Sequence, residues 1–343
     1  MHTIRRSKGW FRVIALSVVA AACSGREAPT SVQTLNPPPN DWVTKASMPT
    51  ARFIAGSAVA NGLMYVVGGR NNVNLNNKSV ADTILEAYDP SADRWTTLAP
   101  LPTHRYDVAA GSVNGIIYAV GGWGFPNPGP CCYMNLLEAY DPSSDSWTTK
   151  APLPIARTGM SVGVVNGILY VVGGLTPAVG EGGGLESRVD AYDPSTNSWT
   201  AKAPMSVARN GVGIADVNGV LYVIGGVNFS GALDLVEAYD PAANTWTTKA
   251  PMPTARYGLA LGVVNGIIYA VGGRGGPSWE YLTTVEAYDP ATDSWTTKPS
   301  MSLPRYFLNV AGIGDHLYAV GGGVTSDSTG FDTVYRLVEE FTP

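Results

Sequence analysis

Six arginines recur at a fixed interval, each ten residues after a tryptophan, and an acidic residue recurs in register with every one of them. The arginines are Arg52, Arg105, Arg157, Arg209, Arg256 and Arg305. The acids are Glu86, Glu138, Asp190, Glu237, Glu286 and Glu339. A buried charge needs a partner of opposite sign, so this register predicts six structural ion pairs. The alternative is a ring of guanidinium groups that faces a ligand.

A second set of positions varies between the repeats, which frees it to serve a ligand. These positions follow each arginine, or follow a Gly-Gly pair that stands 26 residues after each tryptophan. The candidate ligand-binding residues are Arg70, Tyr106, Asp107, Trp123, Asn210, Tyr257, Arg274 and Tyr306. Aromatic rings offer flat apolar area, and hydroxyl and guanidinium groups orient a ligand. A sugar, an anionic metabolite or a peptide suits such a mixed pocket, and ordinary packing of rim loops is the alternative.

Other site chemistry has little support in the residues. Of three histidines, only His104 belongs near the variable positions, so we expect no metal site and no cofactor. Cys131 and Cys132 are adjacent. They form either a strained vicinal disulfide, two free thiols or a bridge to another chain, since adjacent Cα atoms lie closer than in most disulfides.

The tryptophans mark a repeat that must position these residues. They are spaced 47 to 53 residues apart and are Trp42, Trp95, Trp147, Trp199, Trp246 and Trp295. Each unit predicts a strand of small residues, an Asn-Gly hairpin and an apolar strand ending at Gly-Gly. A third strand, an Asp-Pro turn and a fourth strand with the tryptophan follow. The variable positions then meet on one face, because neighbouring strands run antiparallel.

The Gly-Gly pair, a tyrosine shortly before the tryptophan and an arginine after Met-Pro resemble the Kelch repeat. Tyr88 and Trp95, for instance, are seven residues apart. The resemblance covers residues 41–343 and implies a β-propeller with one repeat per blade. We therefore expect an all-β fold, a six-bladed β-propeller of four-stranded antiparallel blades. The tryptophans and tyrosines are expected in the core, and the variable residues at one mouth of the central channel.

The two ends of the repeat region are complementary. The region opens on a fourth-strand segment, residues 41–44, and ends on a third strand, residues 338–341. We expect the N-terminal strand to join the last blade, which closes the ring and removes an exposed sheet edge.

The first 22 residues have the pattern of a signal peptide: basic residues, a short apolar stretch and small residues before Cys23. The position of Cys23 resembles a bacterial lipobox and predicts its acylation, with simple secretion as the alternative. Residues 23–40 read as a linker, and 41–343 as the propeller. Without its basic leader the chain is markedly acidic, which disfavours nucleic acid. We expect an exported monomer of the cell envelope that meets the membrane only through a lipid anchor.

The expected function is binding of a protein, a glycan or a small anionic ligand at the channel mouth, rather than catalysis. A second hypothesis comes from the resemblance, since bacterial six-bladed Kelch proteins include periplasmic sialic-acid mutarotases. Such a reaction needs a general acid and base and an anion clamp. Here those roles would fall to Asp107, Glu181, Glu280, His104, Arg70 and Arg274. The third hypothesis is a structural envelope protein.

Overall fold

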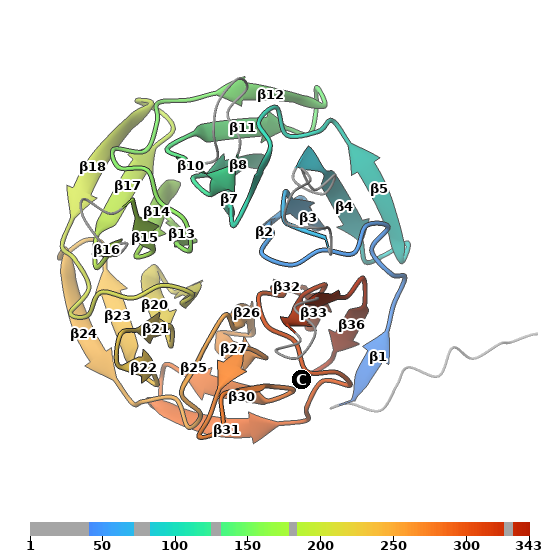
Figure 1. The fold of residues 1–343 in the computed structure, drawn as a ribbon, viewed down its shortest axis with the longest axis vertical. Coiled ribbons are helices and arrows are strands. Elements are labelled where there is room, and N and C mark those ends of the chain that lie inside the picture. Colours follow the sequence, from blue (N-terminus) through green and yellow to red (C-terminus); the bar gives the residue numbers. More distant parts are fainter. Residues whose placement is uncertain (1–40, 72–82, 125–131, 178–183, 326–331) are drawn as a thin grey trace, which may run out of the picture. The chain divides into compact units, whose positions relative to one another are not determined.

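The computed structural model describes residues 41–71, 83–124, 132–177, 184–325 and 332–343. The predicted signal peptide, Cys23, the predicted linker, Cys131 and Glu181 lie outside the described residues. Within them, the secondary structure is β, and none forms a helix long and apolar enough to cross a membrane. Six four-stranded antiparallel sheets stand around a central axis (Figure 1). The predicted six-bladed all-β propeller is thus confirmed.

Each blade runs from an inner first strand to an outer fourth strand. Blades 1 and 2 contain β2 (Gly56–Ala60), β3 (Leu63–Val67), β4 (Leu85–Asp89) and β5 (Arg94–Leu98), then β7 (Ala109–Val113), β8 (Ile116–Val120), β11 (Leu137–Asp141) and β12 (Ser146–Thr149). Blades 3 and 4 contain β13 (Ser161–Val165), β14 (Ile168–Val172), β17 (Val189–Asp193) and β18 (Ser198–Lys202), then β19 (Gly213–Val217), β20 (Val220–Ile224), β23 (Val236–Asp240) and β24 (Thr245–Lys249). Blades 5 and 6 contain β26 (Ala260–Val264), β27 (Ile267–Val271), β30 (Val285–Asp289) and β31 (Ser294–Lys298), then β32 (Asn309–Ile313), β33 (His316–Val320), β36 (Val338–Phe341) and β1 (Trp42–Thr44).

Turn and strand chemistry explain this blade. Asn61 and Gly62 both have positive φ, 51° and 77°, as the tight hairpin between β2 and β3 requires. The first strands crowd together near the axis. A Cβ placed on Gly56 would lie 2.8 Å from the Val108 carbonyl oxygen of the next blade. Small residues on the inner strands therefore follow from the convergence of the blades.

The buried tyrosines lie between neighbouring blades. The hydroxyl of Tyr88 donates to Oδ1 of Asp93 at 2.7 Å, and the same oxygen accepts the Ala46 amide of the preceding blade at 2.8 Å. The arrangement recurs at Tyr140, Tyr192, Tyr239 and Tyr288 with Asp145, Asn197, Asn244 and Asp293. The prediction that the tyrosines are core residues is confirmed.

For the tryptophans the prediction of a core position was only partly right, because they are half-buried. They stand on the outer strands, which have one face toward solvent. The indole N–H of Trp95 donates to the Ala46 carbonyl of the preceding blade at 2.9 Å, and that of Trp42 donates to Pro299 at 2.9 Å. The same bond forms at Trp147, Trp199, Trp246 and Trp295. The tryptophans therefore join blades at their outer seams.

Blade 6 combines strands from the two ends of the repeat region. β1 pairs antiparallel with β36, with Trp42 opposite Phe341 and Thr44 opposite Glu339. Phe341 takes the place of the repeated tyrosine, and its ring stacks on Trp42 at 5.1 Å between ring centroids. Blade 6 thus keeps the tryptophan bond of the other outer seams, but Phe341 has no hydroxyl to donate as the tyrosines do, and no turn connects β1 with β36.

The buried tyrosines predict a loss of stability at alkaline pH. Burial raises the pKa of Tyr192 and Tyr239 to about 12, whereas an unfolded tyrosine titrates near 10. Above about pH 10 the unfolded chain releases protons that the folded chain keeps, so the free energy of unfolding falls between pH 10 and 12. Urea unfolding at about pH 9 and pH 11, with phenolate absorbance as a second signal, measures this. Equal stability at both values would contradict it.

Candidate ligand-binding site

The six repeated arginines form the frame of the site. Nη2 of Arg52 donates to Oε2 of Glu86 at 2.8 Å and to the Val66 carbonyl at 3.1 Å, while Nη1 donates to the carbonyls of Ile84 and Gly68 at 2.8 and 3.3 Å. Burial lowers the pKa of Arg52 to about 10, against the opposing effect of Glu86. One side chain thus holds the arginine segment, the Gly-Gly segment and the third strand together.

The same ion pair forms in every blade, with nitrogen–oxygen distances of 2.5–2.8 Å. All six arginine side chains are fully buried. The alternative reading, a guanidinium ring that faces a ligand, is therefore wrong. Blade 3 departs from the pattern, because Asp190 also accepts hydrogen bonds from Nε and Nη2 of Arg188.

The two sets of variable positions pair with each other on one face. Tyr106 in β6 (Arg105–Tyr106) pairs with Trp123 in β9 (Trp123–Gly124), and Tyr257 in β25 (Arg256–Tyr257) pairs with Arg274 in β28 (Arg274–Gly275). In each of the other four repeats, the corresponding two residues form an isolated antiparallel β-bridge: Phe53 with Arg70, Thr158 with Leu175, Asn210 with Val227, and Tyr306 with Gly323. The structure thus brings the eight candidate residues to the rim of the same face.

The second residue after each arginine forms what we call the mouth ring: Ile54, Asp107, Gly159, Gly211, Gly258 and Phe307. All six have positive φ, between 48° and 64°. Most of the ring is joined by backbone bonds between blades, such as the Gly258 amide to Gly211 at 2.8 Å and the Phe307 amide to Gly258 at 2.7 Å. Glycine adopts this conformation freely, whereas a β-branched residue such as Ile54 does so only under strain.

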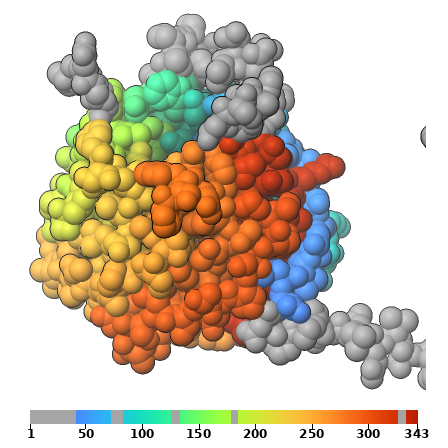
Figure 2. Space-filling model, turned by 60° about the horizontal axis from the view of Figure 1, so that its bottom comes forward, coloured from blue at the N-terminus to red at the C-terminus, as the bar shows by residue number. Residues whose placement is uncertain are grey.

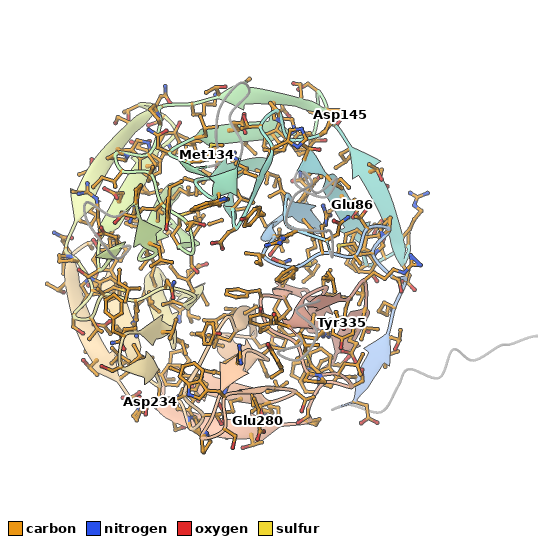
Figure 3. The ribbon with its side chains drawn as sticks, in the orientation of Figure 1. Glu86, Met134, Asp145, Asp234, Glu280 and Tyr335 are labelled. Carbon is orange, nitrogen blue, oxygen red and sulfur yellow. The ribbon has the colours of Figure 1, made fainter. Side chains whose placement is uncertain are left out.

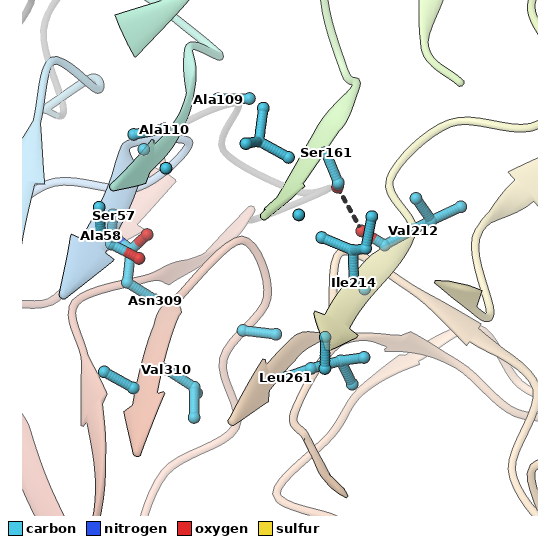
Figure 4. A pocket seen from close by; sticks show the side chains of 18 of the residues that line it. Ser57, Ala58, Ala109, Ala110, Ser161, Val212, Ile214, Leu261, Asn309 and Val310 are labelled. Atoms are coloured by element: carbon cyan, nitrogen blue, oxygen red, sulfur yellow. Dashed lines mark hydrogen bonds between the residues drawn. The ribbon is translucent and has the colours of Figure 1, made fainter. Parts of the chain in front are cut away.

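The mouth ring is asymmetric. Blades 6, 1 and 2 contribute Phe307, Ile54 and Asp107, whereas blades 3, 4 and 5 contribute glycine. The six residues line a central channel with a volume of about 410 Å³. Figure 4 shows its wall of first strands, with mostly small and apolar side chains and the bond from the Ser161 hydroxyl to the Val212 carbonyl at 2.6 Å. Three side chains therefore narrow one half of the mouth, and the glycine arc leaves the other half wider.

One sector of the mouth is polar. The carboxylate of Asp107 accepts a hydrogen bond from the Thr158 hydroxyl. Burial raises the pKa of Asp107, although the bonds from Thr158 and the Gly159 amide act in the opposite direction. Asn210 lies close by, since its Nδ2 would be 3.7 Å from a Cβ on Gly159. A carboxylate, a hydroxyl and an amide thus come from three successive blades.

The opposite sector is aromatic. Tyr306 and Phe307 have ring centroids 4.7 Å apart, and Tyr257 lies 6.1 Å from Phe307. Tyr281, in β29 (Glu280–Tyr281), lies 5.1 Å from Tyr306, and Phe53 lies 6.3 Å from it. The Tyr306 hydroxyl shares a hydrogen bond of 2.7 Å with the Thr325 hydroxyl. These rings form one connected cluster across blades 5, 6 and 1.

The two arginines expected to clamp an anion are already engaged with aromatic rings. The guanidinium carbon of Arg70 lies 5.5 Å from the Tyr106 ring centroid, and that of Arg274 lies 4.8 Å from the Tyr281 ring centroid. Nε of Arg274 also donates to the Trp279 carbonyl at 3.1 Å. Trp123 packs edge-on against Tyr133 of β10 (Cys132–Tyr133), with centroids 4.8 Å apart. Within the described residues, no group of three or more metal-ligating side chains occurs.

Comparison with known proteins identifies the repeat. A family model described as the KLHDC2/KLHL20/DRC7 Kelch-repeats domain matches residues 149–323, about half of the chain, and a Kelch motif model matches residues 52–102 and 104–154. The chain belongs to the Kelch-repeat family. This Kelch propeller is 32% identical over 182 residues to human Kelch repeat and BTB domain-containing protein 12, covering 49% of the chain and 28% of that protein.

Two further comparisons define how far the likeness goes. Beta-scruin of Limulus polyphemus is 32% identical over 196 residues, covering 55% of the chain and 20% of the relative. The chain thus spans about a quarter of the length of these curated relatives. The solved structure of YjhT superposes with a TM-score of 0.71 at 20% identity, covering 85% of the chain and 96% of YjhT. That likeness concerns the fold.

Sequence reasoning missed several residues of the Kelch propeller's mouth. Thr158 is one of the variable positions that follow a repeated arginine, but it was not among the candidate ligand-binding residues and its bond to Asp107 was not predicted. Phe229 and Trp279 lie in loops whose lengths differ between repeats. These loops cannot be aligned with one another, so the repeat pattern did not predict where the two side chains lie. Of the proposed acids and bases, Glu280 is exposed on a hairpin, while His104 is half-buried. One feature of the sequence could have predicted the left-handed backbone of Ile54 and Phe307: the equivalent positions of blades 3, 4 and 5 are glycines.

Proposed function

We propose that this Kelch propeller is a recognition module of the cell envelope whose ligand binds over the mouth ring. The observation that carries the proposal is where strained residues occur. Among the described non-glycine residues with positive φ, ten are the Asn and Asp of two repeated turns, and the others are Ile54, Asp107, Phe307 and Trp279. Such strain costs about 1–3 kcal/mol per residue. Glycine at the equivalent ring positions of three blades indicates that the scaffold itself does not need these side chains.

The ligand classes that fit are a protein, a glycan and a small anionic molecule, and the chemistry of the mouth favours a glycan. A sugar ring has an apolar C–H face that suits the aromatic sector. Its hydroxyl edge suits the carboxylate and amide of Asp107 and Asn210. An anionic ligand has less support, because Arg70 and Arg274 lie over tyrosine rings. Export and acylation of Cys23 complete the proposal and rest on the pattern of residues 1–23.

A second candidate is sugar mutarotation, which the raised pKa and mouth position of Asp107 favour. A carboxyl group whose pKa is raised keeps its proton more readily than a free one and is a stronger base once ionised, which suits acid–base catalysis. Proton NMR of anomer exchange separates the two functions. Acceleration that is lost in Asp107→Asn would assign catalysis, and exchange at the buffer rate would leave binding alone.

Replacing Phe307 by glycine is the decisive test of the binding proposal. The full chain is first screened against glycan, peptide and metabolite libraries. We expect Phe307→Gly to weaken binding of any hit at least about tenfold, or about 1.4 kcal/mol. The free energy of unfolding should change by less than about 1 kcal/mol, because relief of strain offsets the lost ring contacts. Calorimetric titration and urea unfolding give the two values.

Asn61→Gly is the matched control, since it removes a left-handed side chain from a scaffold hairpin outside the mouth ring. It should leave binding unchanged. The proposal fails if the screen yields no ligand, or if the ligand found binds Phe307→Gly as well as it binds the unmodified chain.

A further inference from the structure

Two large aromatic side chains are exposed on neighbouring hairpins beside the mouth. Phe229 is 87% exposed and Trp279 is 45% exposed, the highest values among the exposed large hydrophobic side chains of the described residues. Phe229 lies between β21 (Val227–Asn228) and β22 (Gly231–Ala232) of blade 4, and Trp279 lies between β28 and β29 of blade 5. Single exposed apolar side chains are common, but contiguous ones mark sites of interaction.

The two hairpins touch. A Cβ on Gly231 would lie 3.6 Å from Cζ2 of Trp279. Figure 2 shows the yellow and orange segments of blades 4 and 5 side by side on the surface. Exposed rings on both hairpins therefore belong to a single surface.

Trp279 is held in place by its own blade. Its φ is 56°, a conformation that few non-glycine residues adopt. Its amide bonds to the Gly276 carbonyl at 3.3 Å, and its carbonyl accepts from Nε of Arg274 at 3.1 Å. Arg274 in turn lies over the Tyr281 ring. The strained backbone and the bond from Arg274 together fix a bulky ring at the surface. A hairpin turn does not itself require a tryptophan at this position.

The Trp279 ring is continuous with the aromatic rings of the mouth. Trp279 lies 6.1 Å from Tyr257, and Tyr257 lies 6.4 Å from Tyr306 and 6.1 Å from Phe307. We call Phe229, Trp279, Tyr257, Tyr306 and Phe307 the aromatic track. Phe229 is connected to these rings through the contact of its hairpin with Trp279. The track therefore leads from the blade 4 hairpin to the mouth ring and offers several separate aromatic faces.

The charges beside the track are two exposed carboxylates and the guanidinium of Arg274, which contacts the Trp279 carbonyl and lies over the Tyr281 ring. Asp234 and Glu280 are both exposed on blades 4 and 5, where Figure 3 labels them. Carboxylates accept hydrogen bonds from hydroxyl groups and repel anions. With Arg274 held over Tyr281, the track offers flat apolar faces and two exposed carboxylate acceptors, a surface that suits neutral sugars in sequence better than an acidic polymer.

We propose that the ligand is a neutral linear glycan of several sugar rings, which enters the mouth at one end and lies along the aromatic track over blades 5 and 4. This inference rests on the proposed binding function and extends it outward from the channel. The inner rings of the glycan contact the mouth, where Asp107 and Asn210 accept hydroxyls. The outer rings pack against Trp279 and Phe229.

The test measures affinity against chain length. The full chain is titrated with neutral cello-, xylo-, manno- and malto-oligosaccharides of about two to six rings. Because each further sugar ring that packs on an aromatic face adds contact area, affinity for the preferred series should rise at least about tenfold from the shortest to the longest member. In Phe229→Ser and Trp279→Asn this gain should fall below about threefold, while disaccharide binding stays unchanged. Asparagine tolerates the left-handed backbone of Trp279, so that variant should fold normally.

Leu303→Ser is the matched control, since it removes another exposed apolar side chain from outside the track, and it should retain the full gain. Affinity independent of chain length, a gain that survives in both track variants, or no oligosaccharide binding overturns the inference. A peptide ligand that depends on Phe229 also overturns it and assigns a protein partner. The proposed function is judged separately, because any ligand lost in Phe307→Gly upholds it even when the track variants bind normally.

Discussion

Replacing Arg52 by methionine is expected to lower the free energy of unfolding by about 3–5 kcal/mol. The substitution leaves the carboxylate of Glu86 buried without its counter-charge. It also removes donors from the carbonyls of Val66, Gly68 and Ile84. Urea unfolding of the variant measures the loss.

Two further variants separate the causes of this loss. Arg52→Met combined with Glu86→Leu should recover part of it, because no unpaired charge remains, while the three carbonyls still lack donors. Arg94→Met, which removes an exposed arginine from the same blade, should change stability by less than about 0.5 kcal/mol. A loss below about 1 kcal/mol in Arg52→Met would show that the ion pair contributes little.

Deletion of residues 41–47 is expected to lower the Tm by about 10 °C or more, because it removes about 5 kcal/mol of interactions. The deletion takes away the pairing of β1 with β36, the stacking of Trp42 on Phe341 and the Trp42 bond to Pro299. It also removes the Ala46 carbonyl that accepts from Trp95 in blade 1. Three blades therefore lose contacts, and differential scanning calorimetry records the effect.

The exposed edge of β36 gives this deletion a second signature. An unpaired strand edge promotes association between chains, so light scattering should rise with protein concentration. A deletion of equal length within the predicted linker, residues 30–36, should change neither property. An unchanged Tm after loss of residues 41–47 would mean that the ring does not depend on β1.

The scaffold was predictable because equivalent residues have the same packing environment in every blade. The arginine ten residues after each tryptophan and the Asn-Gly hairpin have physical roles that hold for all six repeats. Equal spacing therefore identified the four strands and the pairing of Arg52 with Glu86. The fourth-strand position of Trp95 was predicted, but its half-buried state was not, because a large apolar residue fits both a core position and a half-buried seam.

The site was predictable only as a set of positions. The pairing of Tyr257 with Arg274 follows from antiparallel strands, but the guanidinium of Arg274 stacks on a tyrosine from the adjoining loop strand. The direction of a long side chain depends on neighbours that have no repeat register. The same reason hid Phe229 and Trp279, whose exposure depends on contact between hairpins of different length.

The antiparallel pairing of β1 and β36 determines how the ring responds to mechanical load. Trp42 lies opposite Phe341, so the outward ends of both strands are together, and force applied there peels the pairs apart one after another. Shearing, which breaks all pairs at once, needs a larger force. A propeller tethered through Cys23, as proposed, and pulled by a bound polymer would carry that tension through β1. This seam, in which no turn connects the two paired strands, would then be the weakest point of the ring under tension.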